Sequence, residues 1–203
     1  MSPRTDKASE QTKTNILQKA VELFNEHGTA GISMNSLAET LGMSAGNLQY
    51  HYRNKEELLR ALLELMFKEF DAIYPSSAST FTLDTLRNLM RLNFELSWKY
   101  RFFFRELGAL LRNDESLAIR FREIQEKRLQ DQENIFKALM TSTQKKSSLS
   151  AEELRNVVLI GWVLGNTWLS YMESMGQKIN ETALQQAVEV MVQHYKPYLK
   201  EIL

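Results

Sequence analysis

The sequence predicts an all-α fold, with a small N-terminal domain joined by a long helix to a larger helical domain. Apolar residues recur at intervals of three and four, the period of an amphipathic helix. Three prolines and eight glycines in 203 residues are too few for the turns of a β-sandwich or barrel. Serine or asparagine precedes several periodic segments, where such residues cap helices.

Composition restricts the classes of protein. Hydrophobic residues make up 43% of the chain and charged residues 25%, the balance of a globular protein. Cysteine is absent, which excludes disulfides and thiolate metal sites. Residues 1–11 are polar and lack the apolar core of a signal peptide, so a cytoplasmic protein is expected. The formal net charge is zero, so any surface that binds nucleic acid must gather its cations locally.

Four helices are expected at the start of the chain. Ile16, Ala20 and Phe24 repeat at helical spacing before Gly28 ends the pattern. Serine precedes each of the next two segments, and asparagine with glutamate precedes the fourth, so each has a capping signal. The expected helices cover residues 12–28, 33–41, 44–51 and 55–73.

Five longer helices are expected downstream. The small residues Ser76–Thr80 after Pro75 indicate a loop, and Thr141–Leu149 is a second polar loop. Ser150 and Glu153 have the spacing of a capping box. The expected helices cover residues 83–98, 100–112, 115–140, 151–175 and 181–199.

The second and third expected helices have the spacing of a helix-turn-helix. Two helices that cross closely need a small residue on the first, a glycine at the turn and an apolar anchor on the second. Ala38, Gly42 and Leu48 stand at these offsets. The spacing alone also occurs by chance in helical proteins, so the residues around it decide its meaning.

The short helix after this turn offers hydrogen-bonding side chains. Asn47 and Gln49 suit bidentate pairing with adenine in the major groove, whereas Tyr50 and His51 suit phosphate oxygens. Gly46 permits close approach of the backbone. In the plainer interpretation these side chains are solvated surface or pack under the next helix. Further candidates for phosphate contacts are Lys13, Ser33 and Lys55.

The run from Thr12 to Leu62, with ILQKAVELFNEHG and ISMNSLAETLGMSAGNLQYHYRNKEELL, resembles the DNA-binding domain of the TetR family of regulators. The resemblance implies a three-helix DNA-binding head with Ser44–Tyr50 as recognition helix. It also implies a homodimer on a palindromic double-stranded operator and a divergent effector domain. Ala45 stands where the family often has lysine, which removes a phosphate contact. Gln49 stands where an aromatic residue is common, which should alter operator preference.

The expected organisation has three parts. Residues 1–11 form a flexible tail, residues 12–55 a helix-turn-helix DNA-binding domain, and residues 56–203 a helical domain for ligand binding and dimerisation. Aromatic residues gather near residue 100, where either a large core or a ligand cavity results, and core packing is the commoner outcome. The candidate ligand-binding residues are Asn93, Phe94, Trp98, Phe102, Phe103, Arg105, Trp162 and Asn166.

The last two expected helices suit dimerisation. The apolar run Val157–Gly165 has a Gly-x-x-x-Gly spacing but is interrupted at Asn166, and it is shorter than the roughly 18 residues of a membrane span. A buried helix is therefore expected. The last helix adds an apolar stripe that either joins a four-helix interface between subunits or packs inside its own subunit. The stripe consists of Leu184, Ala187, Val188, Met191 and Tyr195.

Other function classes have weaker support. The chain has no glycine-rich phosphate loop and no His-Glu-x-x-His motif, and His27, His51 and His194 are scattered, so neither an enzyme nor a metal or cofactor site is expected. A helical protein-protein adaptor without sequence-specific DNA binding remains the alternative. The favoured interpretation is a ligand-responsive transcriptional regulator, a repressor, whose effector is a small hydrophobic or aromatic molecule.

Overall fold

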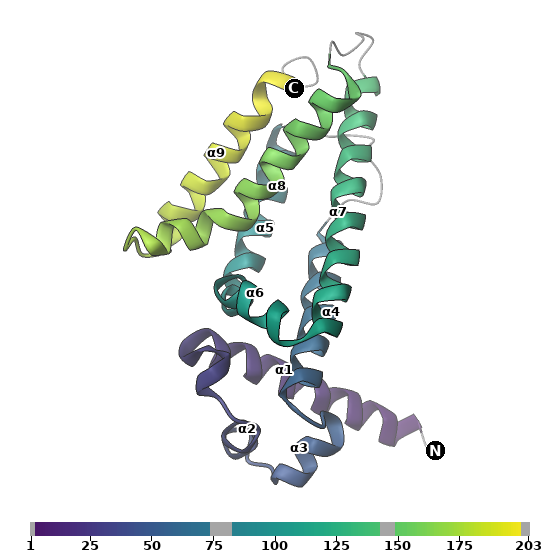
Figure 1. Cartoon of the computed structure of the whole chain (residues 1–203), viewed down its shortest axis with the longest axis vertical. Coiled ribbons are helices and arrows are strands. Elements are labelled where there is room, and N and C mark those ends of the chain that lie inside the picture. Colours follow the sequence, from purple (N-terminus) through teal and green to yellow (C-terminus); the bar gives the residue numbers. More distant parts are fainter. Residues whose placement is uncertain (1–2, 74–82, 143–148, 200–203) are drawn as a thin grey trace. The chain divides into compact units, whose positions relative to one another are not determined.

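The computed structural model describes residues 3–73, 83–142 and 149–199, and every regular element in these ranges is an α-helix (Figure 1). The predicted all-α fold is confirmed. The helices are α1 (Pro3–Gly31), α2 (Met34–Thr40), α3 (Ala45–His51), α4 (Lys55–Ala72), α5 (Leu83–Lys99), α6 (Arg101–Asn113), α7 (Glu115–Ser142), α8 (Ala151–Ser174) and α9 (Glu181–Leu199). The loop expected at Ser76–Thr80 lies outside the described residues, as does most of the loop expected at Thr141–Leu149.

The chain forms two compact units. The first contains residues 1–67 and 99–119, and the second contains residues 68–98 and 120–203. The first unit thus combines α1 to α3 and most of α4 with α6, whereas the sequence placed residues 99–119 in the C-terminal domain. The difference arises because α6 is hydrogen-bonded to α1.

The start of α1 differs from the sequence prediction. Residues 1–11 were expected to be a flexible tail, but α1 begins at Pro3. The Thr12 hydroxyl donates to the Ala8 carbonyl at 2.9 Å, and the Thr14 hydroxyl donates to the Glu10 carbonyl at 3.0 Å. Each hydroxyl donates to the carbonyl four residues earlier, one helical turn away, so the helix includes this polar segment.

The helix-turn-helix has the predicted anchors. Ala38 and Leu48 are buried, and Gly42 has φ 66°, in the left-handed region that glycine adopts without strain. The Gly42 N–H donates to the carbonyl of Glu39, and the Met43 N–H donates to that of Ala38, both at 3.0 Å. These bonds end α2 and turn the chain sharply into α3.

Side-chain caps fix the ends of the short helices. The Ser33 hydroxyl accepts from the Ser36 N–H, and the Ser44 hydroxyl accepts from the Asn47 N–H, both at 3.1 Å. At α4, the Asn54 side chain accepts from the backbone of residue 57, as predicted. The carboxylate at residue 57, however, accepts from the backbone of residue 53 rather than 54.

Asn25 fixes α6 on α1. Its side-chain nitrogen donates to the Lys99 carbonyl at 2.7 Å, and its side-chain oxygen accepts from the Phe102 N–H at 3.0 Å. The ring of Phe24 lies 5.4 Å from that of Phe102, and both are buried. The aromatic residues at the start of α6 therefore complete the core of the first unit.

Glu106 of α6 caps the chain where Gly28 breaks α1. Gly28 has φ 72°, which frees the Thr29 N–H to donate to the Glu106 carboxylate at 2.9 Å. The Thr29 hydroxyl donates to the other carboxylate oxygen. A Cβ at Gly28 would lie 2.9 Å from the nearer oxygen, so both conformation and space favour glycine. This cap ties α6 to the segment that leads into α2.

A second polar contact joins α4 to the start of α7. The Arg60 guanidinium donates twice to the buried Asp114 carboxylate, at 2.8 and 3.0 Å, and Asp114 also accepts from the Leu117 N–H. Burial alone raises the pKa of Asp114, but the hydrogen bonds from Arg60 and Leu117 outweigh it and hold the pKa below its ordinary value. Asp114 therefore stays ionised as it pairs with Arg60 and caps α7.

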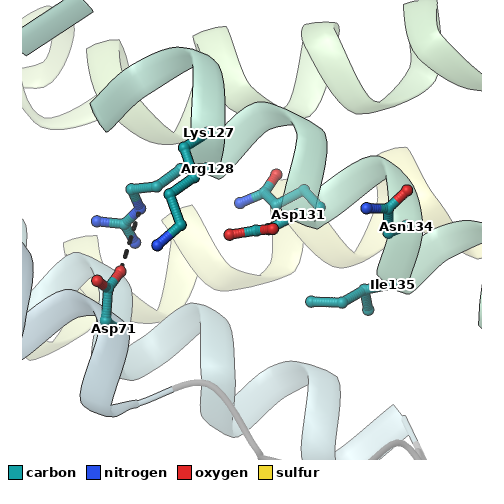
Figure 2. Close-up of a pocket in the computed structure, with 7 residues that line it drawn as sticks. Asp71, Lys127, Arg128, Asp131, Asn134 and Ile135 are labelled. Carbon is teal, nitrogen blue, oxygen red and sulfur yellow. Dashed lines mark ion pairs between the residues drawn. The ribbon is translucent and has the colours of Figure 1, made fainter. Parts of the chain in front are cut away.

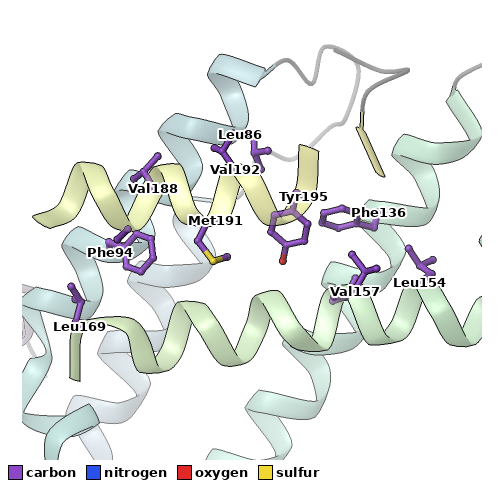
Figure 3. Close-up of a cluster of buried hydrophobic side chains, with 12 residues drawn as sticks. Leu86, Phe94, Phe136, Leu154, Val157, Leu169, Val188, Met191, Val192 and Tyr195 are labelled. Atoms are coloured by element: carbon purple, nitrogen blue, oxygen red, sulfur yellow. The ribbon is translucent and has the colours of Figure 1, made fainter. Parts of the chain in front are cut away.

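The second unit has one apolar core to which α5, α7, α8 and α9 contribute. Figure 3 shows Met191 and Tyr195 of α9 directed toward α8, with Phe136 beside Tyr195 at a ring separation of 4.7 Å. Most of the apolar stripe predicted on the last helix is thus buried inside its own chain. The buried members of the core are Leu86, Phe94, Phe136, Leu154, Val157, Val158, Leu169, Ala187, Val188, Met191, Val192 and Tyr195.

α9 packs tightly against α8 at Gly161. A Cβ built at Gly161 would lie 1.9 Å from the Tyr195 hydroxyl oxygen, so no larger residue fits without a shift. Beside this contact, His194 Nε2 lies 2.8 Å from the Val157 carbonyl oxygen. The apolar run around Gly161 is a packing surface between helices. Among the described helices, none is long and apolar enough to span a membrane.

Candidate nucleic-acid interface

α3 presents a polar, uncharged face to solvent. Leu48 is fully buried under it and anchors the helix, while Tyr50 keeps 79% of its surface exposed. The exposed residues of the segment are Ser44, Ala45, Gly46, Asn47, Gln49 and Tyr50. The structure therefore brings the predicted DNA-contacting residues of α3 together on one surface.

At Gly46 the backbone of α3 itself is exposed on that surface. Gly46 is helical, and a Cβ built on it would meet no atom within 4 Å. Nothing in the fold of the first unit therefore requires glycine here. The absent side chain leaves room for an outside partner.

The C-terminal end of α3 is partly buried. The His51 ring is half-buried and lies edge-on to the Tyr50 ring, with centroids 5.3 Å apart. Its Nδ1 is enclosed and has no hydrogen-bond partner among the described residues. Tyr52 is buried, and burial, with the charges of Glu10 and Glu57, raises its pKa to about 12. Tyr52 is thus a neutral core residue and Tyr50 the exposed one.

The three flanking candidates already have partners within the chain. Lys55 Nζ donates to the Thr29 carbonyl at 2.7 Å, which leaves two of its three N–H donors for another acceptor. Lys13 Nζ lies 3.1 Å from the Glu10 carboxylate. The Ser33 hydroxyl caps α2. Ser33 and Lys55 thus have roles in the fold of the first unit, whereas the Lys13 pair is an exposed contact within one helix that adds little stability.

Arg53 is a further candidate that the sequence reasoning missed. It is exposed and lies between α3 and α4, and its guanidinium makes no ion pair or hydrogen bond with any described residue. Its backbone N–H donates to the Glu57 carboxylate at 3.0 Å, so the backbone of Arg53 is held in place. A lone arginine directly after a recognition helix is the signal that could have identified it.

The candidate ligand-binding residues divide between the two units. Phe102 and Phe103 are buried in the first unit. Arg105 belongs to the same unit, and its guanidinium donates to the Asn25 carbonyl at 3.1 Å. These three residues pack or hold α6 on α1.

The other candidates lie in the second unit. Phe94 is part of the apolar core, and Trp98 and Trp162 are half-buried. The Asn93 and Asn166 side chains each donate to the carbonyl one turn earlier, at 2.9 and 2.7 Å. Of this group, Trp162 lies near Arg128, a residue that lines a pocket.

That pocket has a volume of about 460 Å³, which is within the range of small-molecule sites. Figure 2 shows Asp71 and Arg128 at one end and Ile135 at the other. Arg128 is only 7% exposed, and its guanidinium carbon lies 4.9 Å from the Phe70 ring centroid and 5.9 Å from that of Trp162. The lining residues are Asp71, Lys127, Arg128, Asp131, Gln132, Asn134 and Ile135. In the described part of the chain, no cluster of three or more potential metal ligands occurs.

A helix-turn-helix with an exposed, hydrogen-bonding second helix defines a DNA-binding regulator. The model of the N-terminal region of bacterial regulatory proteins of the TetR family matches residues 16–62, and the TetR model described as a bacterial transcriptional repressor matches residues 66–202. The chain belongs to the TetR family of transcriptional regulators. Both models describe regulatory proteins rather than enzymes.

Individual relatives agree with this assignment. The chain is 30% identical over 92 residues to the probable regulator ArpR of Pseudomonas putida, a match that spans 45% of this chain and 44% of ArpR. It is 26% identical to the probable regulator YttP of Bacillus subtilis over 94% of this chain and 90% of YttP. A TetR-family regulator from Marinobacter aquaeolei VT8 has a similar structure, with TM-score 0.79, 28% identity, and coverage of 92% and 90% of the two chains.

Proposed function

We propose that the protein is a ligand-responsive repressor that acts in the cytoplasm and binds a palindromic operator as a homodimer. The observation that carries this proposal is the exposed polar face of α3 over its buried anchor Leu48. Asn47 and Gln49 would contact base edges, and Tyr50, His51, Arg53 and Lys55 would contact phosphate oxygens. In a dimer, the two α3 helices would enter the major groove about 34–36 Å apart, one turn of DNA.

Selection from a random duplex pool at near-physiological salt tests the operator. We expect enrichment of a palindrome with half-sites about 10 base pairs apart. A double variant, Gln49→Ala with Tyr50→Ala, changes two exposed side chains, so it should fold normally by circular dichroism and lose the enrichment. Only salt-labile background binding by the wild type would contradict operator recognition and favour the adaptor alternative.

The second copy would bind along α8. One side of this helix packs on α9, yet large apolar side chains are also exposed along its other side, at intervals close to one helical turn. They are Leu159, Ile160, Val163, Tyr171 and Met175, which are 43% to 61% exposed. A second copy offers the same apolar stripe, and two such stripes would cover each other in a symmetric interface. TetR-family proteins usually bind their operators as dimers.

Two glutamates introduced into this exposed apolar stripe should dissociate the dimer. We expect the Ile160→Glu, Val163→Glu variant to have the mass of one chain, 23.6 kDa, by light scattering, and the wild type twice that mass. Both residues are more than half exposed, so the fold should survive. Gln177→Glu, on the exposed segment after α8, is the control and should remain a dimer. A monomeric wild type at micromolar concentration would contradict this interface.

The effector would bind in the pocket beside Arg128. Lys127 and Arg128 line one end together with Asp71, Asp131 lies in the middle, and Asn134 and Ile135 stand at the other end (Figure 2). An effector with an anionic head for the two cations and an apolar body beside Ile135 suits this lining. The nearby Phe70 and Trp162 rings suit the hydrophobic or aromatic character predicted from the sequence. Release from DNA requires that the effector bind the DNA-incompetent conformation more tightly.

Arg128→Met tests this site because methionine keeps an apolar stem and removes the charge. Medium-chain fatty acids, which have an anionic head and an apolar body, should release the wild type from the selected duplex. The variant should need roughly tenfold more of the same compound, since a charge-assisted hydrogen bond is lost. Lys178→Met, on the exposed α8–α9 segment, should respond like the wild type. Equal responses of Arg128→Met and the wild type, or no release of either, would exclude this assignment.

A further inference from the structure

The reading face of α3 carries no formal charge, and this limits the bases that it can recognise. Arginine and lysine are the side chains that pair with guanine O6 and N7, and aspartate or glutamate accepts from cytosine N4. None of these residue types occurs in α3, whose sequence is AGNLQYH. The usual contacts to a G·C pair are therefore missing from this helix.

The side chains present suit adenine and thymine. The exposed Gln49 carboxamide can donate to adenine N7 and accept from its N6 amino group. Ala45 lies one turn before Gln49 on the same side of the helix, and its exposed methyl group can contact a thymine methyl. The Tyr50 ring, next along the exposed face, offers a further apolar surface, while its hydroxyl stays available for the phosphate contact proposed above.

The cations around α3 are occupied or lie outside it. Lys55 donates to the Thr29 carbonyl, and the Arg60 guanidinium is held by Asp114 at 2.8 and 3.0 Å. Arg53 follows α3 after Tyr52 ends it, where phosphate is the nearer target than a base edge. In this account the cations around α3 contribute affinity for the DNA backbone, and the uncharged face of α3 recognises the base sequence.

We infer that each half-site of the operator presents A·T pairs to α3, with adenine read by Gln49 and thymine methyl groups read by Ala45 and Tyr50. The inference rests on the proposed DNA-binding function and specifies its ligand. Gly46 lies between these side chains on the exposed face and lets the helix approach the base edges.

Base analogues in the selected duplex test the inference. The positions that face α3 are identified first, as those whose base preference changes between selections with the wild type and with Gln49→Ala. At these positions, 7-deazaadenine removes N7, and uracil removes the thymine methyl group. We expect each analogue to weaken wild-type binding by roughly five- to tenfold, and the same analogues outside the half-sites to have no effect.

Gln49→Ala is the matched protein variant. It should bind the adenine and 7-deazaadenine duplexes equally, because the carboxamide that senses N7 is gone, while it still distinguishes thymine from uracil. Selection of G·C pairs at the positions that face α3, or wild-type binding unchanged by both analogues, would overturn the inference and leave operator binding intact. Failure to select any duplex would instead overturn the proposed function.

Discussion

Gly161→Ala should destabilise the second unit by about 1–3 kcal/mol, the usual cost of forcing a methyl group into a packed core. The new Cβ would lie 1.9 Å from the hydroxyl oxygen of Tyr195 and 2.5 Å from its ζ carbon. Tyr195 is buried against Phe136, so its ring cannot move aside freely. Thermal or urea unfolding followed by circular dichroism measures the change.

Gly165→Ala is the matched control on the same helix. Its Cβ would have ordinary contact with the terminal carbon of Met191 at 3.9 Å. Alanine has a higher helix propensity than glycine, so this variant should be as stable as the wild type or more stable by up to about 1 kcal/mol. Equal destabilisation by Gly161→Ala and Gly165→Ala would contradict the packing of α8 on α9.

Gly46→Ala should weaken operator binding without loss of stability. Nothing lies within 4 Å of the added Cβ, so the free protein tolerates it, and the helix propensity of alanine should raise stability by about 0.5–1 kcal/mol. On DNA, the methyl group would stand at the closest approach of α3 to the base edges. We expect a loss of affinity of roughly tenfold or more, measured by fluorescence anisotropy on the selected duplex.

The comparison variant for Gly46→Ala is Gly108→Ala, in the middle of α6 and away from α3. Its Cβ would lie 3.3 Å from the end of the flexible Arg112 side chain, which can adjust. This variant should bind DNA like the wild type. Unchanged DNA affinity of Gly46→Ala would show that α3 does not approach the bases through Gly46.

The sequence predicted helices well because the capping and periodicity signals are local. Ser44, Gly42 and Leu48 each determine structure through neighbours within a few residues, and all three have the predicted roles. The capping box of Ser150 with Glu153 is likewise present at 3.2 and 2.7 Å. Local chemistry of this kind does not depend on the rest of the fold.

Long-range partners could not be predicted in the same way. The aromatic start of α6 was compatible with a large core or a ligand cavity, and the sequence could not show that Phe102 packs on Phe24, which is 78 residues away in the sequence. The sequence proposed Lys55 for a phosphate contact, but it could not show that the Lys55 ammonium also donates to the Thr29 carbonyl, 26 residues away. The apolar stripe of α9 fitted either an interface or a core, and only the position of α8 shows that Met191 and Tyr195 belong to the core.

The most direct test of the central claim, that the exposed face of α3 reads DNA, is a ratio of affinities. The ratio compares the selected duplex with a scrambled duplex of the same composition, at fixed salt, for the wild type and for Gln49→Ala with Tyr50→Ala. We predict a ratio of roughly a thousand or more for the wild type and a ratio near one for the double variant, with folding unchanged. An equal ratio for the double variant and the wild type would contradict the claim.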